Sequence, residues 1–339
     1  MSLLERVQEK FNSDLNTTRV MVIGDYMLDR YIIGDVRRIS PEAPIPVVAV
    51  SEELFRLGGA GNVVSNLASL GATADCFPFL GFDEGSEQLL RLFDRKNISV
   101  TPFRNAEVRT IIKARLVARK QQIARIDWDP PPQFRFPKEL QTQLLPQVEH
   151  QMKTSRSLVL SDYGKGMLTG ELLTEIFALA KKHSVDCFVD PKHEDYRVYR
   201  GCASITPNTK EAFEATGIEA VCDETAEKAV RRVHELTGAR SVFVTRAEKG
   251  ITVLDANSDS VKHFPALARE VADVSGAGDT VISMLALAHE LGFDAFDSAV
   301  LANIAASVVV SHFGTVPCTQ VEFLESAQAF LQNHPEGLA

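Results

Sequence analysis

Short apolar runs alternate with helical patterns along most of this 339-residue chain, and that alternation restricts the possible folds more than any other feature. Strands are expected at residues 19–24, 73–80, 157–161, 185–189, 241–245 and 267–271. Helices are expected at residues 62–70, 86–96, 140–154, 170–183, 209–216, 225–237 and 280–291, with one more ending near residue 311. This order predicts an α/β fold, a doubly wound, mostly parallel sheet flanked by helices, with ligands at the carboxyl ends of the strands.

Two segments, at about residues 31–55 and 104–128, interrupt the alternation. The first holds three prolines beside β-branched residues, and the second alternates apolar and basic side chains between Ile112 and Arg119. A period of two predicts a strand with one polar face. Neither segment has a helix of its own to cross the sheet. We therefore expect one domain over residues 1–339, in which the two segments form a small antiparallel β-sheet that projects as a lid.

The charge of the lid differs from that of the chain as a whole. Residues 104–125 hold seven Lys or Arg and one Glu, a local charge of +6, whereas the formal net charge of the chain is −9. A lid that covers an anionic substrate would explain this contrast, and so would a solvated charged face. The acidic balance disfavours binding to nucleic acid or to an anionic membrane.

Other features of the composition indicate a cytoplasmic protein. The first 14 residues are polar and amphipathic, without the apolar stretch of an export signal, and no apolar run is long enough to span a bilayer. The five cysteines are widely spaced and form no CxxC pair, as expected of reduced thiols. The eight histidines form no HxxxH or HxH pair, so a zinc site held by the protein is not indicated.

The chemistry of the chain is most evident at residues 273–280, Asp-Val-Ser-Gly-Ala-Gly-Asp-Thr, which precede a helical pattern. The small residues Gly276, Ala277 and Gly278 let backbone N–H groups converge on an anion at the helix N-terminus. Asp279 falls in the first helical turn, where a carboxylate would repel a phosphate that is only bound. Phosphoryl transfer needs such a carboxylate, because it accepts the proton of the attacking hydroxyl. The run therefore indicates a kinase.

A dinucleotide site is the main alternative for this glycine-rich turn. Gly276 and Gly278 supply two of the three glycines of that fingerprint, but Val281 stands at the third position. The run also lies near the C-terminus, whereas the fingerprint opens the first βαβ unit. These departures disfavour an NAD-dependent oxidoreductase, and an ordinary strand-to-helix turn remains the simpler alternative.

Polar residues at other strand ends point to one crevice. The carboxylates of Asp25, Asp162 and Asp190 each follow an expected strand, so they should converge where ligands of such sheets bind. A turn or a helix cap would explain each of the three alone. Lys165 and Lys192 lie next to two of these carboxylates and are candidate phosphate contacts.

A glycine-rich element, Gly58-Gly59-Ala-Gly-Asn62, opens an expected helix. Its glycines would let the backbone approach a ligand closely, and the amide of Asn62 could bind a hydroxylated molecule. A glycine-rich turn with an Asn cap is the alternative.

Asn208 and Glu211 share one face at the start of another expected helix, where they could hold water around Mg²⁺. The same spacing makes a capping box, which is the preferred interpretation for this pair alone. The turn from Thr245 to Gly250 follows a strand and suits the ribose or phosphates of a nucleotide, without being specific for them.

In this order, and over nearly the whole chain, these pieces resemble the ribokinase-like (PfkB) carbohydrate kinase family. The run at 273–280 is highly specific for that family, and the Gly-Gly-x-x-Asn and Asn-x-x-Glu elements support it. The resemblance implies that Asp279 is the catalytic base and that backbone N–H groups of residues 276–279 form an anion hole. It also implies that Asn208 and Glu211 organise Mg²⁺, through water, beside ATP.

The resemblance assigns the other candidate residues to three ligands. Those expected to hold the sugar phosphate are Asp25, Arg38, Gly58, Gly59, Asn62, Arg119, Asp162, Lys165, Asp190 and Lys192. Those expected at the nucleotide are Asn208, Glu211, Thr245, Gly250, Ala302, Asn303 and Ala306. A monovalent cation such as K⁺ is expected beside Asp273, Ser275 and Gly314.

Three runs resemble the branch of the family that acts on D-glycero-β-D-manno-heptose 7-phosphate. They are Arg-Ile-Ser-Pro-Glu-Ala-Pro-Ile-Pro-Val at 38–47, Leu-Ser-Asp-Tyr-Gly-Lys-Gly at 160–166 and Asp-Pro-Lys at 190–192. The resemblance implies phosphorylation of the anomeric hydroxyl to the 1,7-bisphosphate, in ADP-heptose and lipopolysaccharide core synthesis, by the stand-alone form of the kinase. Residues 245–247, Thr-Arg-Ala, depart from the family's Thr-x-Gly turn.

The apolar face of the lid is too large to stay exposed, so we expect a homodimer through lid-to-lid contact. Two other functions remain open. One is a kinase for ribose, fructose or a fructose phosphate, and the other is a non-catalytic module that senses a sugar or a nucleotide. The presence of Asp279, Asn208 and Glu211 together disfavours the sensor.

Overall fold

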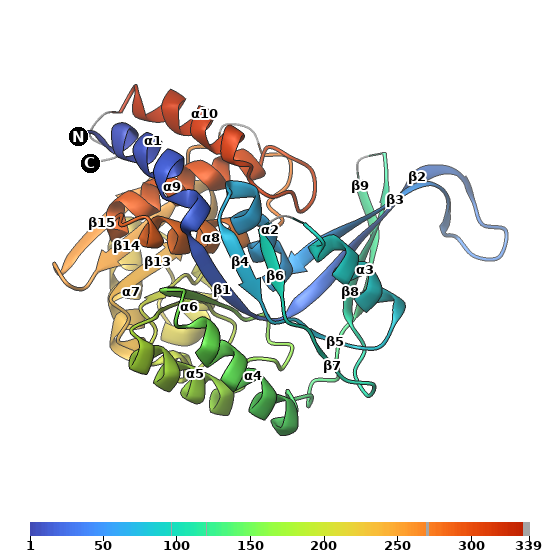
Figure 1. Ribbon diagram of the computed structural model, residues 1–339. Helices are drawn as coiled ribbons and strands as arrows, with labels where there is room; N and C mark the ends of the chain where they lie inside the picture. Colours follow the sequence, from blue (N-terminus) through green and yellow to red (C-terminus); the bar gives the residue numbers. More distant parts are fainter. Residues whose placement is uncertain (96, 120, 269–270, 335–339) are drawn as a thin grey trace.

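A mostly parallel sheet forms the centre of the structure. The computed structural model describes residues 1–95, 97–119, 121–268 and 271–334, and within them nine strands pair in the order β15-β14-β13-β12-β11-β10-β1-β4-β6 (Figure 1). The strands are β1 Arg19–Gly24, β4 Thr73–Cys76, β6 Ile98–Val100, β10 Ser157–Ser161, β11 Asp186–Asp190, β12 Ser204–Ile205, β13 Ser241–Thr245, β14 Ile251–Asp255 and β15 Ser260–Phe264. The pairs from β13 to β6 are parallel, whereas β14 and β15 pair antiparallel at one edge.

Helices cover both faces of this sheet and bury a separate apolar core on each. The helices on one face are α1 Leu3–Ser13, α2 Ala60–Leu70, α3 Glu84–Phe93, α8 Ala277–Glu290, α9 Ala295–Val309 and α10 Gln320–Leu331. Those on the other are α4 Lys138–Gln151, α5 Gly170–His183, α6 Thr209–Thr216 and α7 Asp223–Thr237. The doubly wound α/β fold expected from the alternation is therefore confirmed.

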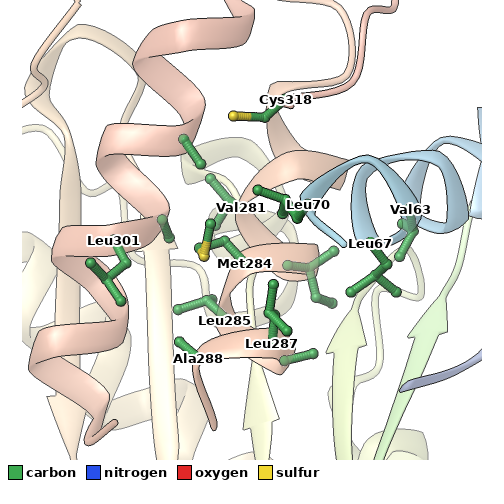
Figure 2. Packing of buried hydrophobic residues seen from close by; sticks show 14 of the residues in the cluster. Val63, Leu67, Leu70, Val281, Met284, Leu285, Leu287, Ala288, Leu301 and Cys318 are labelled. Atoms are coloured by element: carbon green, nitrogen blue, oxygen red, sulfur yellow. The ribbon is translucent and has the colours of Figure 1, made fainter. Parts of the chain in front are cut away.

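Helix α8 is the innermost helix of its layer. Its residues from Asp279 to Ala288 are all buried, as expected of a helix that is apolar on every side. Figure 2 shows its side chains packed between those of α2 and α9, with Met284 and Leu285 close to Leu67 and Leu301. Because α8 is enclosed in this way, the carboxylate in its first turn has a fixed position relative to α2.

The lid is a four-stranded sheet in the order β3-β2-β8-β9 that extends away from the body (Figure 1). Its strands are β2 Tyr26–Ile39, β3 Pro46–Gly59, β8 Ile111–Ala118 and β9 Gln121–Trp128. The pairs β2–β3 and β8–β9 are antiparallel hairpins, as expected, and the parallel pair β2–β8 joins them. The lid is also longer than expected, since β2 begins directly after β1 and β3 runs into α2. Lys120, counted among the basic residues of the lid, lies outside the described residues.

Two expected strands differ from the structure. The strand expected at 73–80 divides into β4 and β5 Phe79–Leu80, and β5 pairs with β7 Phe103–Arg104 in a separate small sheet. The strand expected at 267–271 is wrong for Leu267, Ala268 and Val271, which lie outside any strand, while residues 269 and 270 lie outside the described residues. The element that precedes α8 is instead the hairpin β14–β15, which completes the sheet edge. None of the described helices is long and apolar enough to cross a membrane.

Candidate active site

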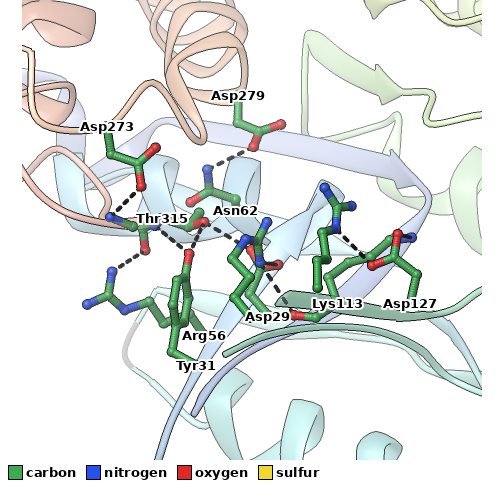
Figure 3. A network of polar contacts seen from close by, with 12 residues as sticks. Asp29, Tyr31, Arg56, Asn62, Lys113, Asp127, Asp273, Asp279 and Thr315 are labelled. Atoms are coloured by element: carbon green, nitrogen blue, oxygen red, sulfur yellow. Dashed lines mark hydrogen bonds and ion pairs between the residues drawn. The ribbon is translucent and has the colours of Figure 1, made fainter. Parts of the chain in front are cut away.

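The carboxylate of Asp279 lies in the first turn of α8 and is held from two sides. Its Oδ2 accepts a hydrogen bond of 2.8 Å from Nδ2 of Asn62 in α2, and its Oδ1 accepts one of 2.8 Å from the hydroxyl of Tyr163 (Figure 3 shows the contact with Asn62). The residue is only 3% exposed. Burial is the main cause that raises the pKa of Asp279 to about 7, and the nearby charge of Asp29 adds to it. The two hydrogen bonds, from Asn62 and Tyr163, lower this pKa but do not offset the burial. A carboxylate with this pKa can accept a proton near neutral pH.

The turn that precedes Asp279 is shaped by Gly276. This residue has φ of 81°, and a Cβ added to it would lie 2.6 Å from Nδ2 of Asn62. The N–H groups of Gly278 and Asp279 find no acceptor among the described residues, whereas that of Ala277 donates to the carbonyl of Val274 at 3.3 Å. Free N–H groups at a helix N-terminus favour an anion, so the N–H groups of Gly278 and Asp279 are available for the expected anion hole, whereas that of Ala277 is bonded to Val274.

Asp25 anchors a loop. Its buried carboxylate accepts hydrogen bonds from the backbone N–H groups of Tyr163 at 2.9 Å, Lys165 at 3.0 Å and Met167 at 3.3 Å. Burial raises the pKa of Asp25 to about 6, helped by the charge of Asp162. The carboxylate expected to bind sugar hydroxyls therefore also holds the loop that follows β10.

Asp162 and Asp190 lie at the ends of neighbouring strands, β10 and β11. Oδ1 of Asp162 accepts from the N–H of Gly164 at 2.8 Å, and its Oδ2 accepts from the hydroxyl of Tyr199 at 2.6 Å. Burial raises the pKa of Asp190 well above its usual value, and the charges of Asp279, Glu211 and Asp162 act in the same direction. These carboxylates therefore crowd one crevice.

Beside this crevice, a pocket of about 460 Å³ is lined by basic and acidic side chains together. The charged residues in its lining are Arg135, Asp162, Lys192, His193, Glu194 and Asp195. Lys192 also reaches Oε1 of Glu211, with 3.3 Å from Nζ. Lys192 thus links the lining of the pocket to the first turn of α6.

Asn208 and Glu211 form the capping box of α6. The side-chain oxygen of Asn208 accepts from the N–H of Glu211 at 3.0 Å, and Oε2 of Glu211 accepts from the N–H of Asn208 at 3.0 Å. The sequence could not separate this arrangement from a magnesium site. Within the described residues no group of three or more His, Cys, Asp or Glu has the arrangement of a metal site. The crowded carboxylates of Asp190 and Glu211 nonetheless suit a hydrated divalent cation, because such a cation would offset their mutual repulsion.

The two lysines named as phosphate contacts differ in their surroundings. Nζ of Lys165 contacts Oδ2 of Asp129 at 2.7 Å, and the same carboxylate pairs with Lys113. Lys113 is 4% exposed and also pairs with Asp127 at 3.0 Å. Much of the positive charge of the lid is therefore neutralised by aspartates that the count over residues 104–125 left out.

Asp29 is a second buried carboxylate at the root of the lid, and the sequence analysis missed it. It pairs with Arg115, and its Oδ2 accepts from the hydroxyl of Thr315 at 3.0 Å (Figure 3). A Cβ on Gly58 would lie 2.7 Å from Asp29, which explains a glycine there. Asp29 stands four residues beyond Asp25 on a strand that was not expected to begin so early, so no local signal marked it.

The loop that carries Gly314 closes against the run before α8. Oδ1 of Asp273 accepts from the N–H of Ser275 at 2.9 Å, and its Oδ2 accepts from the N–H of Gly314 at 3.0 Å. Partial burial would raise the pKa of Asp273, but the hydrogen bonds from Ser275 and Gly314 lower it. The three residues expected at a monovalent cation are thus adjacent, and Arg56 of the lid donates to the carbonyl of Thr315 in the same loop at 3.0 Å.

The remaining candidate residues are dispersed. Ala302 is fully buried in the core, the amide of Asn303 donates to the carbonyl of Pro265 at 2.6 Å, and Ala306 is half-buried. Thr245 ends β13, and Gly250 has φ of 84° where a Cβ would collide with Phe264.

Gly59 is the N-cap of α2 and has φ of 56°. A Cβ added to it would lie 2.5 Å from the carbonyl oxygen of Asp25. Arg38 and Arg119 lie exposed on the lid.

Comparison with known proteins agrees with this geometry. Residues 17–322 match the model of the pfkB family carbohydrate kinases. The chain is 41% identical over 321 residues to the bifunctional protein HldE of Paramagnetospirillum magneticum, and 42% identical over 314 residues to that of Rhodospirillum rubrum. These matches cover 93% and 89% of this chain but 63% and 61% of the relatives, so the chain spans less than two thirds of their length.

Solved structures show the same fold at low identity. Phosphofructokinase-2 from Escherichia coli in complex with potassium superposes with a TM-score of 0.77 at 19% identity, covering 92% of this chain and 98% of that one. Ribokinase of Arabidopsis thaliana complexed with ribose and ATP gives a TM-score of 0.69 at 18% identity, with the same shares covered. The chain therefore belongs to the pfkB family of carbohydrate kinases, which transfer a phosphoryl group to an alcohol group of a sugar.

Proposed function

We propose that the protein phosphorylates the anomeric hydroxyl of D-glycero-D-manno-heptose 7-phosphate with ATP, giving the 1,7-bisphosphate. The observation that carries the proposal is the carboxylate of Asp279, buried beside free helix N–H groups and with a pKa raised to about 7 by burial. The choice of sugar rests on the runs at 38–47, 160–166 and 190–192 and on the relatives named HldE at about 40% identity.

The residues of the chain divide the chemistry among them. Asp279 accepts the proton of the attacking hydroxyl, and the N–H groups of Gly278 and Asp279 stabilise negative charge that develops on the transferred group. Kinases of this family use ATP, which would supply the phosphoryl group, and a divalent cation, which would offset the negative charge of its phosphates. Glu211, Asn208 and Asp190 would hold Mg²⁺ through water, and the Asp273 loop would hold K⁺.

The phosphate on C7 of the sugar needs a cation that is still available. Lys113 and Arg115 are already paired with aspartates, and Lys165 shares Asp129. Arg38 and Arg119 remain as candidates with exposed side chains, and Lys192 is a third candidate, which would exchange its contact with Glu211 for the phosphate. If the variants Arg38→Gln, Arg119→Gln and Lys192→Gln all keep the KM for the sugar phosphate, the anchor lies elsewhere.

The lid also supports a homodimer. Its strand β9 is exposed along nearly its whole length, and apolar side chains on the lid face solvent: Ile39, Ile45, Val50, Ile123 and Ile126. A second copy of the lid would cover them. Sedimentation at micromolar concentration should give a dimer, and Ile126→Asp should dissociate it, whereas a monomeric wild-type protein would refute the assembly.

The reaction is tested by measuring ADP release with Mg²⁺–ATP against heptose 7-phosphate, unphosphorylated heptose, ribose and fructose 6-phosphate, with Asp279→Asn as control. We expect turnover with heptose 7-phosphate that the variant loses, by roughly 10²–10⁴ in kcat. Turnover with another sugar would keep the mechanism and overturn the substrate. No turnover with any of them would favour the sensing module.

A further inference from the structure

The loop between β10 and α5 contacts the two buried carboxylates of the site at once. The backbone N–H of Tyr163 donates to Oδ2 of Asp25 at 2.9 Å, and its side-chain hydroxyl donates to Oδ1 of Asp279 at 2.8 Å. Asp25 directly follows strand β1 of the sheet, and Asp279 lies in the first turn of α8 on one face of it. One residue therefore links the sheet edge to the first turn of α8.

The conformation of this loop is narrowly determined. The carboxylate of Asp25 accepts hydrogen bonds from three backbone N–H groups of the loop, those of Tyr163, Lys165 and Met167. Gly164 and Gly166 have φ of 66° and 93°, and a Cβ on Gly166 would lie 2.5 Å from the carbonyl oxygen of Phe134. A carboxylate that gathers three N–H groups replaces the regular backbone pairing that such a loop lacks. The position of Tyr163 is thus fixed through the hydrogen bond of its own backbone N–H.

Two donors on different elements fix the orientation of the Asp279 carboxylate. Asn62 on α2 binds one oxygen, and Tyr163 on the loop binds the other. With a single donor, the carboxylate could rotate about its last side-chain bond, because that torsion is broad in Asp. With both, the plane of the carboxylate is set before any ligand arrives.

We propose that Tyr163 is a positioning residue for the Asp279 base and that Asp25 acts through the loop to hold Tyr163 in place. The inference rests on the proposed function, in which Asp279 takes the proton of the sugar hydroxyl. It gives Asp25 a structural part in catalysis in addition to the contact with the sugar that the sequence predicts. Tyr163 controls which lone pairs of Asp279 remain for the incoming hydroxyl.

The arrangement has a consequence for the pH dependence of the reaction. A hydrogen bond donated to the ionised carboxylate lowers its pKa, so losing the tyrosine hydroxyl should raise the pKa of Asp279. The other groups that face Asp279 are the amide of Asn62 and the carboxylates of Asp29 and Asp190, and the substitution leaves all three unchanged.

The test compares pH profiles of kcat/KM for the wild type and Tyr163→Phe on the sugar that the panel identifies. In the variant, the acidic limb should move up by about one pH unit, the value expected for a hydrogen bond to a charged group. The kcat on the plateau should fall about ten- to a hundredfold, as for a mispositioned group. The KM for the sugar should change little, because the hydroxyl that the substitution removes is the one that donates to Asp279.

Tyr196→Phe is the matched control. Tyr196 is also buried, but its hydroxyl has no hydrogen-bond partner among the described residues, so its loss should leave the acidic limb where it is. An unmoved limb in Tyr163→Phe, or a raised KM with unchanged kcat, would overturn the inference. Activity retained in Asp279→Asn would instead refute the base itself, so the two failures are distinguishable.

A second variant tests the part assigned to Asp25. Asp25→Asn loses one acceptor for the loop N–H groups, and it should move the acidic limb in the same direction as Tyr163→Phe. The double variant should show little more than the larger single effect, because residues in one network are not additive. Shifts that simply add would show that Asp25 does not act through Tyr163.

Discussion

Replacing Asp279 with Asn should stabilise the fold while removing activity, and the gain should depend on pH. The carboxyl has a pKa of about 7 in the folded protein, against 3.8 in the absence of burial. Because the folded-state pKa is raised, the wild type loses stability as pH rises from near 4 to near 7, and the loss then stays constant. Asn carries no such penalty at any pH.

The size of this pH-dependent stability difference can be worked out for two assay conditions, one below and one above the pKa of Asp279. From pH 5.5 to pH 8.5 the cost of the ionised carboxylate should grow by about 2 kcal/mol, since about 1.5 pH units of titration remain below the pKa, at about 1.4 kcal/mol each. With about 2.1 cal/mol/K of unfolding entropy per residue, this corresponds to about 3 °C in Tm for the whole chain. Comparing two conditions cancels any pH-independent difference between the side chains.

The surroundings of Asp279 also accommodate Asn. Its carbonyl oxygen can accept from Asn62, and its NH₂ group can donate to the hydroxyl of Tyr163, which can accept as well as donate. Differential scanning calorimetry of both proteins at the two pH values measures the effect. A difference in Tm that is equal at both values, or smaller at pH 8.5, would refute the argument that burial raises this pKa.

Three further perturbations have defined outcomes. Gly276→Ala puts a Cβ 2.6 Å from Nδ2 of Asn62, at a residue with φ of 81°. It should lower the free energy of unfolding, measured with denaturant, by about 1–3 kcal/mol, and it should lower kcat. Gly278→Ala is the stability control, because its Cβ would meet nothing within 4 Å. Mild alkylation of the native protein should label Cys222 alone. This cysteine is exposed and its pKa is lowered, whereas burial raises the pKa of the other four thiols. A second label found by mass spectrometry would contradict the burial of those four. Removing divalent cations with EDTA should abolish ADP release and excess Mg²⁺ should restore it, whereas activity that survives chelation would refute a role for the cation.

Much of the fold could be predicted because its signals are local. The strand β10 and the helices α5 and α6 have the expected bounds, since apolar runs and caps such as Thr169 and Asn208 mark where each begins. The hairpin β14–β15 was missed because it lies at the sheet edge, beyond the last expected crossover. A strand was expected at 267–271 where the chain runs as a loop over the described residues.

A site residue could be predicted where its own local sequence indicates its role. It could not be predicted where the role depends on a contact with a residue far away in the sequence. Asp279 follows from the turn that carries it. Asp25 has the sequence environment of a ligand-binding carboxylate, but its partners are N–H groups some 140 residues away. Lys165 was expected to be free for phosphate, and its pairing with Asp129 arises from the packing of the lid connector on the β10 loop. No local pattern encodes such distant contacts.

The helices nearest the two ends of the chain pack together at a distance from the lid. Phe11 of α1 stacks on Phe323 of α10, with 4.9 Å between the ring centres, and both helices lie at the opposite end of the molecule from the β2–β3 hairpin (Figure 1). Either helix can thus serve as a fixed attachment point for a surface tether or a fluorophore. A second label on the tip of the lid would then report the distance between the lid and a stationary base, readable one molecule at a time.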